Sequence, residues 1–222
     1  MPAKNSIKTY ISNGYYHIYN RGVEKRKIFL DEQDYAVFLS YLKEYLLPKD
    51  ENGLRNKLAK ENFTWHDRAE IVKTLRMNNF YEEIILLVFC LMSNHFHLLI
   101  KQNKFDSIDK FIGSLCSRYS VYFNKKYKRV GKLFQGVYKA VLVKNEEYLL
   151  YLSKYIHIQA ENDRTKRPSS LDMYLGKSHI EWVNSDLILS YFSGTKRNLS
   201  YNDFIFQPKE DSFVNISELL IE

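Results

Sequence analysis

Apolar and polar positions along the chain predict an alternation of strands and helices. Residues 15–20 are aromatic and β-branched, which favours a first strand, and the apolar side chains of residues 34–46 recur at helical spacing. Residues 84–92 form a continuous apolar run that suits a buried strand. A short polar break separates that run from residues 95–101, which we expect to form a neighbouring antiparallel strand.

Three further elements complete the expected domain. Residues 107–127 carry an apolar stripe with a period near 3.6, and residues 134–143 alternate and are rich in β-branched side chains. Asn145 then supplies a cap for a third long helix. The order β-α-β-β-α-β plus a helix predicts an α+β fold with a ferredoxin-like antiparallel sheet and helices mainly on one face. The opposite face would be free for a site.

The chain has 222 residues, which suffices for one sizeable core. We expect a catalytic domain over residues 1–165 and a C-terminal extension over residues 166–222, in which residues 187–192 suit a small helix. Residues 48–80 are rich in charges and Asn, so they are interpreted as an insertion; within them, residues 67–75 suit a short amphipathic helix.

Composition narrows the function only modestly. The chain has 33 Lys and Arg against 26 Asp and Glu, which favours polyanions but would also suit ribosomal contacts or an anionic membrane. Two cysteines allow neither a disulfide framework nor a CxxC zinc site, and we expect both to be reduced core residues of a cytoplasmic protein. The longest apolar stretch is too short to span a bilayer, so we expect no insertion into a membrane. Phosphate-loop, serine-hydrolase, zincin and dinucleotide motifs do not occur.

The sequence His95-Phe96-His97 is the sharpest local signal. On a strand, a period of two turns both imidazoles to one face, where they could hold a divalent metal. Two unrelated histidines in a half-exposed strand would give the same pattern, and the residues alone leave the two interpretations about equal. Tyr151, Tyr155 and Gln159 share one face of the following helix, although amphipathic packing explains most tyrosines in a chain that has 18 of them.

A basic stretch with interleaved aromatic residues begins inside the second long helix and continues past its end, over residues 118–132. Such a segment can neutralise phosphates and stack on unpaired bases, but a solvated helix end would look the same. Its cations are Arg118, Lys125, Lys126, Lys128, Arg129 and Lys132, and Arg21 adds positive charge after the first strand.

Two of these segments resemble the HUH single-tyrosine transposases of the insertion-sequence two-hundred type. Residues 91–99 resemble the motif in which a hydrophobic residue separates two metal-binding histidines, and residues 154–159 resemble the helix that carries the nucleophile. Residues 16–22, 28–31 and 131–140 resemble the REP-associated subgroup, and the last of these segments adds Lys139 to the DNA-binding candidates. The chain departs from that subgroup in having Ser93 for Pro, Gln159-Ala160 for Asn-Pro, and the 48–80 insertion.

The resemblance implies a function. It assigns Tyr155 as the nucleophile and His95, His97 and Gln159 as ligands of Mg²⁺ or Mn²⁺, in an enzyme that cleaves and rejoins single-stranded DNA through a 5′-phosphotyrosine. The expected partner is single-stranded DNA with a hairpin, in a bacterial or archaeal cytoplasm, nucleoid-associated when bound; a homodimer is left open. The alternatives are a non-catalytic, domesticated nucleic-acid-binding protein of ferredoxin-like fold and a metal-dependent hydrolase.

Overall fold

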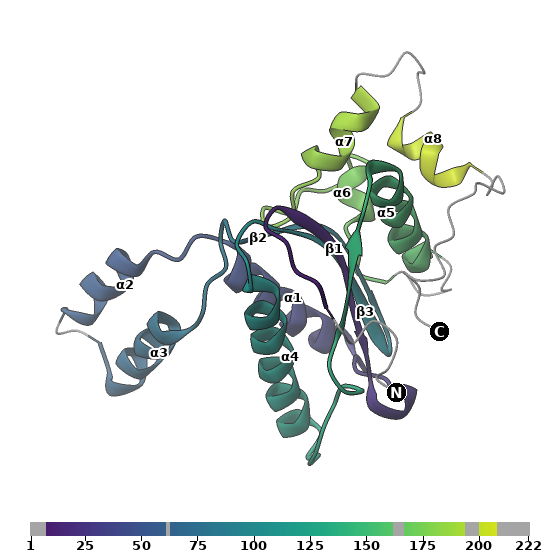
Figure 1. Cartoon of the computed structure of the whole chain (residues 1–222). Coiled ribbons are helices and arrows are strands. Elements are labelled where there is room, and N and C mark those ends of the chain that lie inside the picture. The colour runs from purple at the N-terminus through teal and green to yellow at the C-terminus, as the bar shows by residue number, and fades with distance from the viewer. Residues whose placement is uncertain (1–7, 61–62, 162–166, 194–199, 208–222) are drawn as a thin grey trace.

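A four-stranded antiparallel sheet forms the centre of the molecule (Figure 1). The computed structural model describes residues 8–60, 63–161, 167–193 and 200–207. The strands lie in the order β2-β3-β1-β4, so the first and third strands are central and antiparallel to each other. With one helical crossover on each side of the β2-β3 pair, this is the ferredoxin-like arrangement, and the expected fold class is confirmed. The strands are β1 (Gly14–Arg21), β2 (Ile84–Met92), β3 (His95–Gln102) and β4 (Lys139–Val143).

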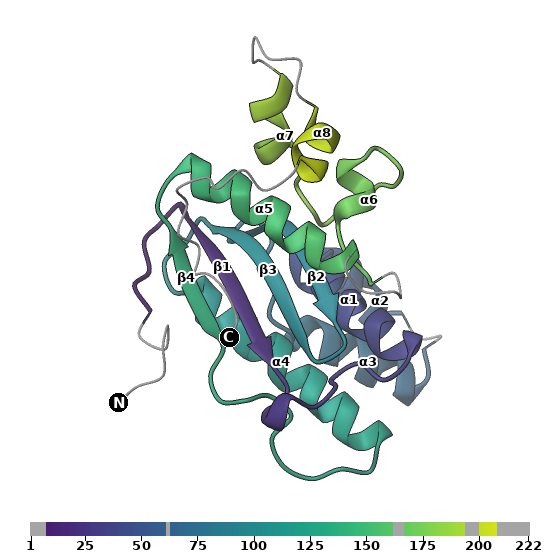
Figure 2. The ribbon, with the colours of Figure 1, turned by 90° about the vertical axis from the view of Figure 1, so that its right-hand side faces the viewer.

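One face of the sheet is covered by two long helices, α1 (Glu32–Leu46) and α4 (Ser107–Lys126) (Figure 2). Their apolar stripes meet the inward side chains of the strands in an aromatic core, in which Phe38, Phe96 and Tyr119 are fully buried. Asp31 caps α1 by accepting the backbone N–H of Asp34, as its position before the helix predicts.

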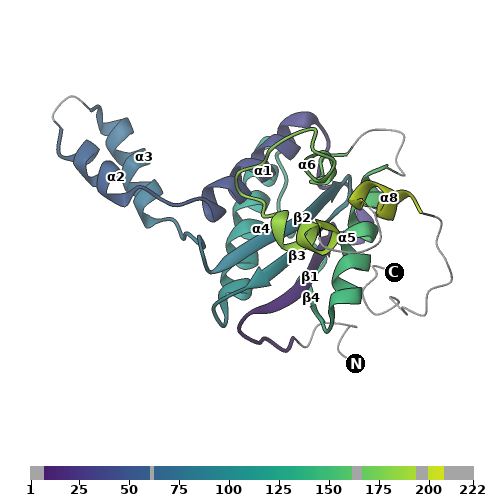
Figure 3. The ribbon, with the colours of Figure 1, turned by 90° about the horizontal axis from the view of Figure 1, so that it is seen from above.

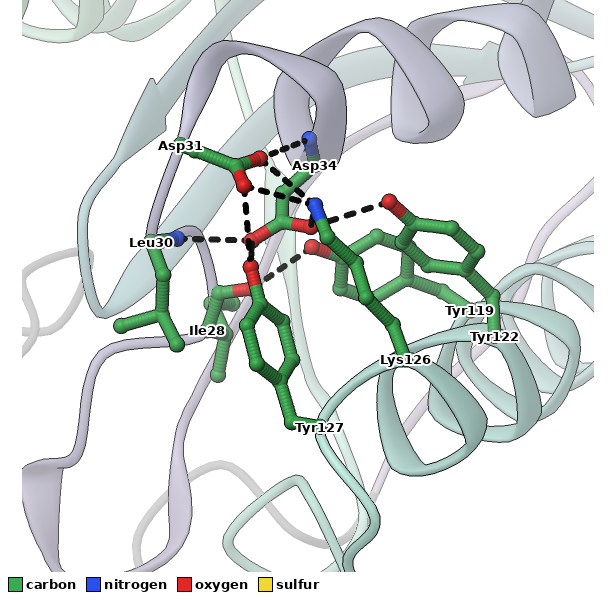
Figure 4. Close-up of polar contacts among 8 residues, drawn as sticks. All are labelled: Ile28, Leu30, Asp31, Asp34, Tyr119, Tyr122, Lys126 and Tyr127. Atoms are coloured by element: carbon green, nitrogen blue, oxygen red, sulfur yellow. Dashed lines mark hydrogen bonds and ion pairs between the residues drawn. The ribbon is translucent and has the colours of Figure 1, made fainter.

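A polar network joins the start of α1 to the end of α4 (Figure 4). The fully buried carboxylate of Asp34 accepts hydrogen bonds from the hydroxyls of Tyr122 and Tyr127, at 3.0 and 2.8 Å. Lys126 Nζ lies 2.8 Å from Asp34 and 2.7 Å from Asp31. A buried carboxylate with this many donors is fully satisfied, so the network fixes how the two helices meet.

The second face carries α5 (Glu146–Glu161), so it is not free as the sequence suggested. The stripe of Leu149, Leu152 and Ile156 needs burial, and it packs on Val88 and Leu99 of the sheet. Three short helices complete this layer next to α5 (Figure 2). They are α6 (Leu171–Tyr174), α7 (Asp186–Ser193) and α8 (Tyr201–Phe206).

The insertion is a pair of helices that extends away from the sheet (Figure 3). It contains α2 (Glu51–Leu58), which the sequence did not predict, and α3 (Trp65–Arg76), which includes the expected helix and begins with a capping box between Thr64 and Asp67. A short 3₁₀ helix, η1 (Val23–Lys25), follows β1. The expected strand over 134–143 is shortened to β4, because the chain turns at Gly136 with φ of +70°. No helix among the described residues is both long and apolar enough to cross a membrane.

Candidate active site

Polar side chains gather on the face of the sheet that α5 covers. In the antiparallel register Cys90, His97, Tyr19 and Lys139 lie opposite one another across the four strands. His95 lies one pleat further along β3, on the same face as His97. The two imidazole rings are 4.9 Å apart between centroids and nearly perpendicular, which is the convergence expected from their spacing.

His97 is fully buried, yet one of its ring nitrogens has no protein partner. Its Nδ1 lies 2.8 Å from Nε2 of His17 on β1, and the two rings stack at 5.0 Å. Its Nε2 has no hydrogen-bond partner among the described residues. Burial, followed by the proximity of His17 and His95, holds the pKa of His97 well below its ordinary value. The imidazole is therefore neutral at pH 7, and one of its ring nitrogens has a lone pair that can bind a metal ion.

His95 is half-buried and is held from the preceding turn. Its Nδ1 lies 2.6 Å from Oδ1 of Asn94, and the amide nitrogen of Asn94 donates to the carbonyl of Lys25 at 3.2 Å. Burial and the nearby Arg21 guanidinium lower the pKa of His95 to about 4. Arg21 is its cross-strand neighbour on β1. His95 is thus also neutral at pH 7.

Tyr155 approaches this pair from α5. Its ring centroid is 5.8 Å from that of His97 and the rings are perpendicular. Burial raises the pKa of the half-buried Tyr155 hydroxyl, and the nearby Tyr19 and Cys90 add to the shift, so the phenol is protonated at neutral pH. Gln159 is half-buried one turn later on the same helix, where residues four apart share a face.

The donor set fits a divalent metal ion. Two neutral imidazoles converge, and the buried Nε2 of His97 gains a partner only from something that is not a described side chain. Among the described residues, no group of three or more His, Cys, Asp or Glu side chains could hold a metal. A third protein ligand would therefore come from another residue type, and the amide oxygen of Gln159 is of a kind that Mg²⁺ and Mn²⁺ accept.

Some of the expected DNA-binding cations lie near these residues. Lys139 is in the cross-strand row of His97, and Arg21, opposite His95, donates from Nε to Gln135 at 2.6 Å. The loop after α4 lies against the end of β1, since Gln135 N donates to the carbonyl of Arg21 at 2.8 Å. Lys132 on that loop is exposed, as are Lys125 and Lys128 at the end of α4.

The other expected DNA-binding residues are engaged within the protein. Arg118 lies 2.7 Å from Glu44 and stacks on Tyr41, on the α1 and α4 side of the sheet. The ammonium of Lys126 belongs to the Asp31 and Asp34 network (Figure 4). Arg129 donates to the side chain of Asn124 at 2.9 Å.

His17 is a residue of this cluster that the sequence interpretation did not single out. It is fully buried and contacts His97 directly. A signal was present, because His17, Tyr19 and Arg21 alternate along the first strand and so must share one face. That this face is also the face of His95 and His97 depends on the register between β1 and β3.

Part of the chain is similar in sequence to known transposases. Residues 54–159 match the family described as IS200-like transposases, and no curated protein matches the chain. Among solved structures, a REP-associated tyrosine transposase bound to a REP hairpin is 10% identical, with a TM-score of 0.46, over 80% of this chain and 95% of the other. A protein described as a transposase from Deinococcus radiodurans R1 is 14% identical, with a TM-score of 0.34, over 69% and 96%. The matched residues 54–159 include His95, His97, Tyr155 and Gln159, so this part of the chain is similar to IS200-like transposases.

Proposed function

We propose that this protein cleaves and rejoins single-stranded DNA, with Tyr155 as nucleophile and with a Mg²⁺ or Mn²⁺ ion held by His95, His97 and Gln159. The observation that carries the proposal is the position of Tyr155, whose ring faces His97 on the side of the sheet where both histidines converge. The buried and unpartnered Nε2 of His97 supports a ligand at this point, as far as the described residues go.

The proposed reaction transfers a phosphoryl group from a 3′ oxygen of the DNA to Tyr155. The hydroxyl oxygen of Tyr155 attacks the scissile phosphorus, the bond to the 3′ oxygen breaks, and the products are a 5′-phosphotyrosine and a free 3′-hydroxyl. A bound divalent ion would withdraw charge from the phosphate oxygens. Because one phosphodiester replaces another, the 3′-hydroxyl of a second strand can reverse the step without ATP.

The protonated state of Tyr155 sets a requirement on that step. Burial raises the pKa of its hydroxyl above a value that is already about 10 in water, so almost no phenolate exists at neutral pH. The phenolic proton must therefore leave as the bond to phosphorus forms, and it passes to solvent or to the departing 3′ oxygen. His95 and His97 cannot serve both as metal ligands through Nε2 and as acceptors at that same atom.

Four lysines would guide the DNA backbone toward this site. Lys139 lies on the site face of the sheet, and Lys125, Lys128 and Lys132 lie at the end of α4 and on the loop beside β1. Their charges would neutralise phosphates, so we expect binding that weakens as the salt concentration rises. The proposed substrate is single-stranded DNA with a hairpin, as the resemblance of residues 16–22, 28–31 and 131–140 to the REP-associated subgroup implies.

The polarity of the covalent link offers a direct test. Purified protein is incubated with Mn²⁺ and hairpin oligonucleotides from the flanks of its gene, labelled at the 3′ end or at the 5′ end. We expect a labelled protein band on a denaturing gel only with the 3′ label, and a shortened DNA fragment with the 5′ label; EDTA should remove both.

The other outcomes identify the alternatives. Cleavage without any labelled protein would mean that water is the nucleophile, as in a metal-dependent hydrolase. Binding of the hairpin with neither cleavage nor adduct would mean a domesticated nucleic-acid-binding protein. Either result would overturn the proposed reaction.

A further inference from the structure

Both candidate metal ligands are held by a neighbour through the same ring nitrogen. The Nδ1 atom of His95 contacts Asn94, and the Nδ1 atom of His97 contacts His17. We infer that Asn94 and His17 are positioning residues, which accept the two Nδ1 protons and so present both Nε2 lone pairs to the metal. This inference rests on the proposed role of the histidine pair as metal ligands.

The direction of the hydrogen bond at His95 follows from the amide of Asn94. The amide nitrogen donates to the carbonyl of Lys25, so the amide oxygen is the atom that faces the ring. An amide oxygen only accepts. Nδ1 of His95 must therefore carry the proton, and in a neutral ring the lone pair is then on Nε2.

At His97 the geometry allows two tautomers, and a cation bound at Nε2 selects the one in which that atom has the lone pair. If His17 donated to Nδ1, Nε2 of His97 would carry an N–H that has no acceptor among the described residues and that would repel a cation. If Nδ1 of His97 donates to Nε2 of His17, the same atom becomes a free lone pair. Metal-ligating histidines commonly donate their second ring nitrogen in this way, which fixes the orientation of the ring.

A second buried histidine shows what the chain does when the role is only structural. His157 is also fully buried, but its Nδ1 lies 2.8 Å from the hydroxyl of Tyr201 and its Nε2 lies 2.8 Å from that of Ser170. Both of its nitrogens are therefore satisfied by protein. His97 differs at Nε2 alone, which is the atom that faces away from His17.

The first test measures Mn²⁺ affinity by titration calorimetry in two variants of the same residue. His17→Phe keeps a ring that can stack on His97 but removes the acceptor, and we expect Mn²⁺ to bind about 10- to 100-fold more weakly. His17→Gln supplies an amide oxygen that can accept the Nδ1 proton, and it should recover most of the affinity. A folded His17→Phe protein with unchanged Mn²⁺ affinity would overturn the role of His17.

A matched pair at Asn94 tests the other half of the inference. Asn94→Asp keeps an oxygen acceptor beside His95, whereas Asn94→Leu removes it at similar size. We expect the Leu variant to lose Mn²⁺ affinity and the Asp variant to retain it. Equal affinities in the two folded variants would overturn the role of Asn94.

The tautomers can also be observed in the unmodified protein, which keeps the inference testable if a variant does not fold. Proton–nitrogen correlation spectra of ¹⁵N-histidine-labelled protein should show His95 protonated at Nδ1 without metal, and His97 protonated at Nδ1 when Mg²⁺ is bound. An Nε2–H tautomer at either residue under these conditions would overturn the inference. The His97→Ala variant separates the two levels: if it binds Mn²⁺ like the unmodified protein, the proposed metal site itself fails.

Discussion

The two faces of the sheet differ in whether their buried polar atoms have hydrogen-bond partners. On the face of α1 and α4, Phe96, Leu98 and Ile100 are fully buried among aromatic rings, and the buried Asp34 nearby has all the donors it needs. On the face of α5, His97 is equally buried, yet one of its nitrogens has no partner among the described residues. One step along the same strand therefore separates a residue of the apolar core from a buried ring nitrogen that no described side chain satisfies, since neighbours on a strand face opposite sides.

The largest effect on stability should come from the apolar face. Phe96→Ala removes a fully buried ring that packs against Phe38 of α1 and should lower the free energy of unfolding by about 3–5 kcal/mol. Urea denaturation followed by circular dichroism measures this loss. The matched change His95→Ala, one residue away and only half-buried, should cost far less. Equal losses in the two variants would contradict the division between the faces.

The largest effect on chemistry should come from the other face. His97→Ala and His95→Ala each remove a proposed metal ligand, and we expect adduct formation to fall by at least about 100-fold, equivalent to about 2.7 kcal/mol in the barrier. Binding of the same oligonucleotide in EDTA should be nearly unchanged, as measured by fluorescence anisotropy. If either variant still cleaves DNA with Mn²⁺, the histidine that it lacks is not a metal ligand.

Removal of Gln159 should have a smaller effect than removal of either histidine. Gln159→Ala deletes a neutral oxygen ligand that water can replace, so we expect the Mn²⁺ concentration needed for half-maximal adduct to rise about tenfold, or about 1.4 kcal/mol. Glu161→Ala, at an exposed position later in the same helix, is the control. An unchanged Mn²⁺ requirement in Gln159→Ala would exclude the amide as a ligand.

The exposed cations should contribute to binding alone. Reversal of Lys125, Lys128 and Lys132 to Glu should weaken single-stranded DNA binding and lower the slope of log affinity against log salt by about 0.7 for each lost phosphate contact. The thermal unfolding temperature should change little. Lys126→Glu is the contrasting variant, because its ammonium pairs with Asp31 and Asp34 and its reversal should destabilise the fold. An unchanged salt slope in the triple variant would mean that these lysines are only a solvated surface.

Local pattern predicted the sheet and the long helices well. The apolar run 84–92 is β2, and the expected strand 95–101 and helix 34–46 agree with β3 and α1 within two residues. The unpredicted α2 contains Gly53 and two Asn residues, and its propensity is too weak to show without Asp50, which accepts from Gly53 N. The spacing of Tyr151, Tyr155 and Gln159 predicted that they share one face of α5. The position of α5 over the sheet could not be predicted, because it depends on tertiary packing.

Features that local pattern did not predict depend on contacts between residues distant in sequence. The pairing of Lys126 with Asp31 and Asp34 could not be predicted, because those two residues precede it by more than 90 positions and no local pattern reveals such a contact. His17 was overlooked for the same reason, since it lies 80 residues before His97. In both cases the residue type was visible in the sequence, and the strand or helix pairing that gave it a role was not.

The most direct test of the account is the covalent adduct formed by Tyr155→Phe beside Tyr151→Phe. Both changes remove one hydroxyl from the same helix and leave a ring to pack, so stability and DNA affinity should stay close to those of the unmodified protein. With Mn²⁺ and a 3′-labelled hairpin oligonucleotide, Tyr151→Phe should form the labelled band and Tyr155→Phe should form none. A labelled band from Tyr155→Phe would contradict the assignment of Tyr155 as the nucleophile that faces His97.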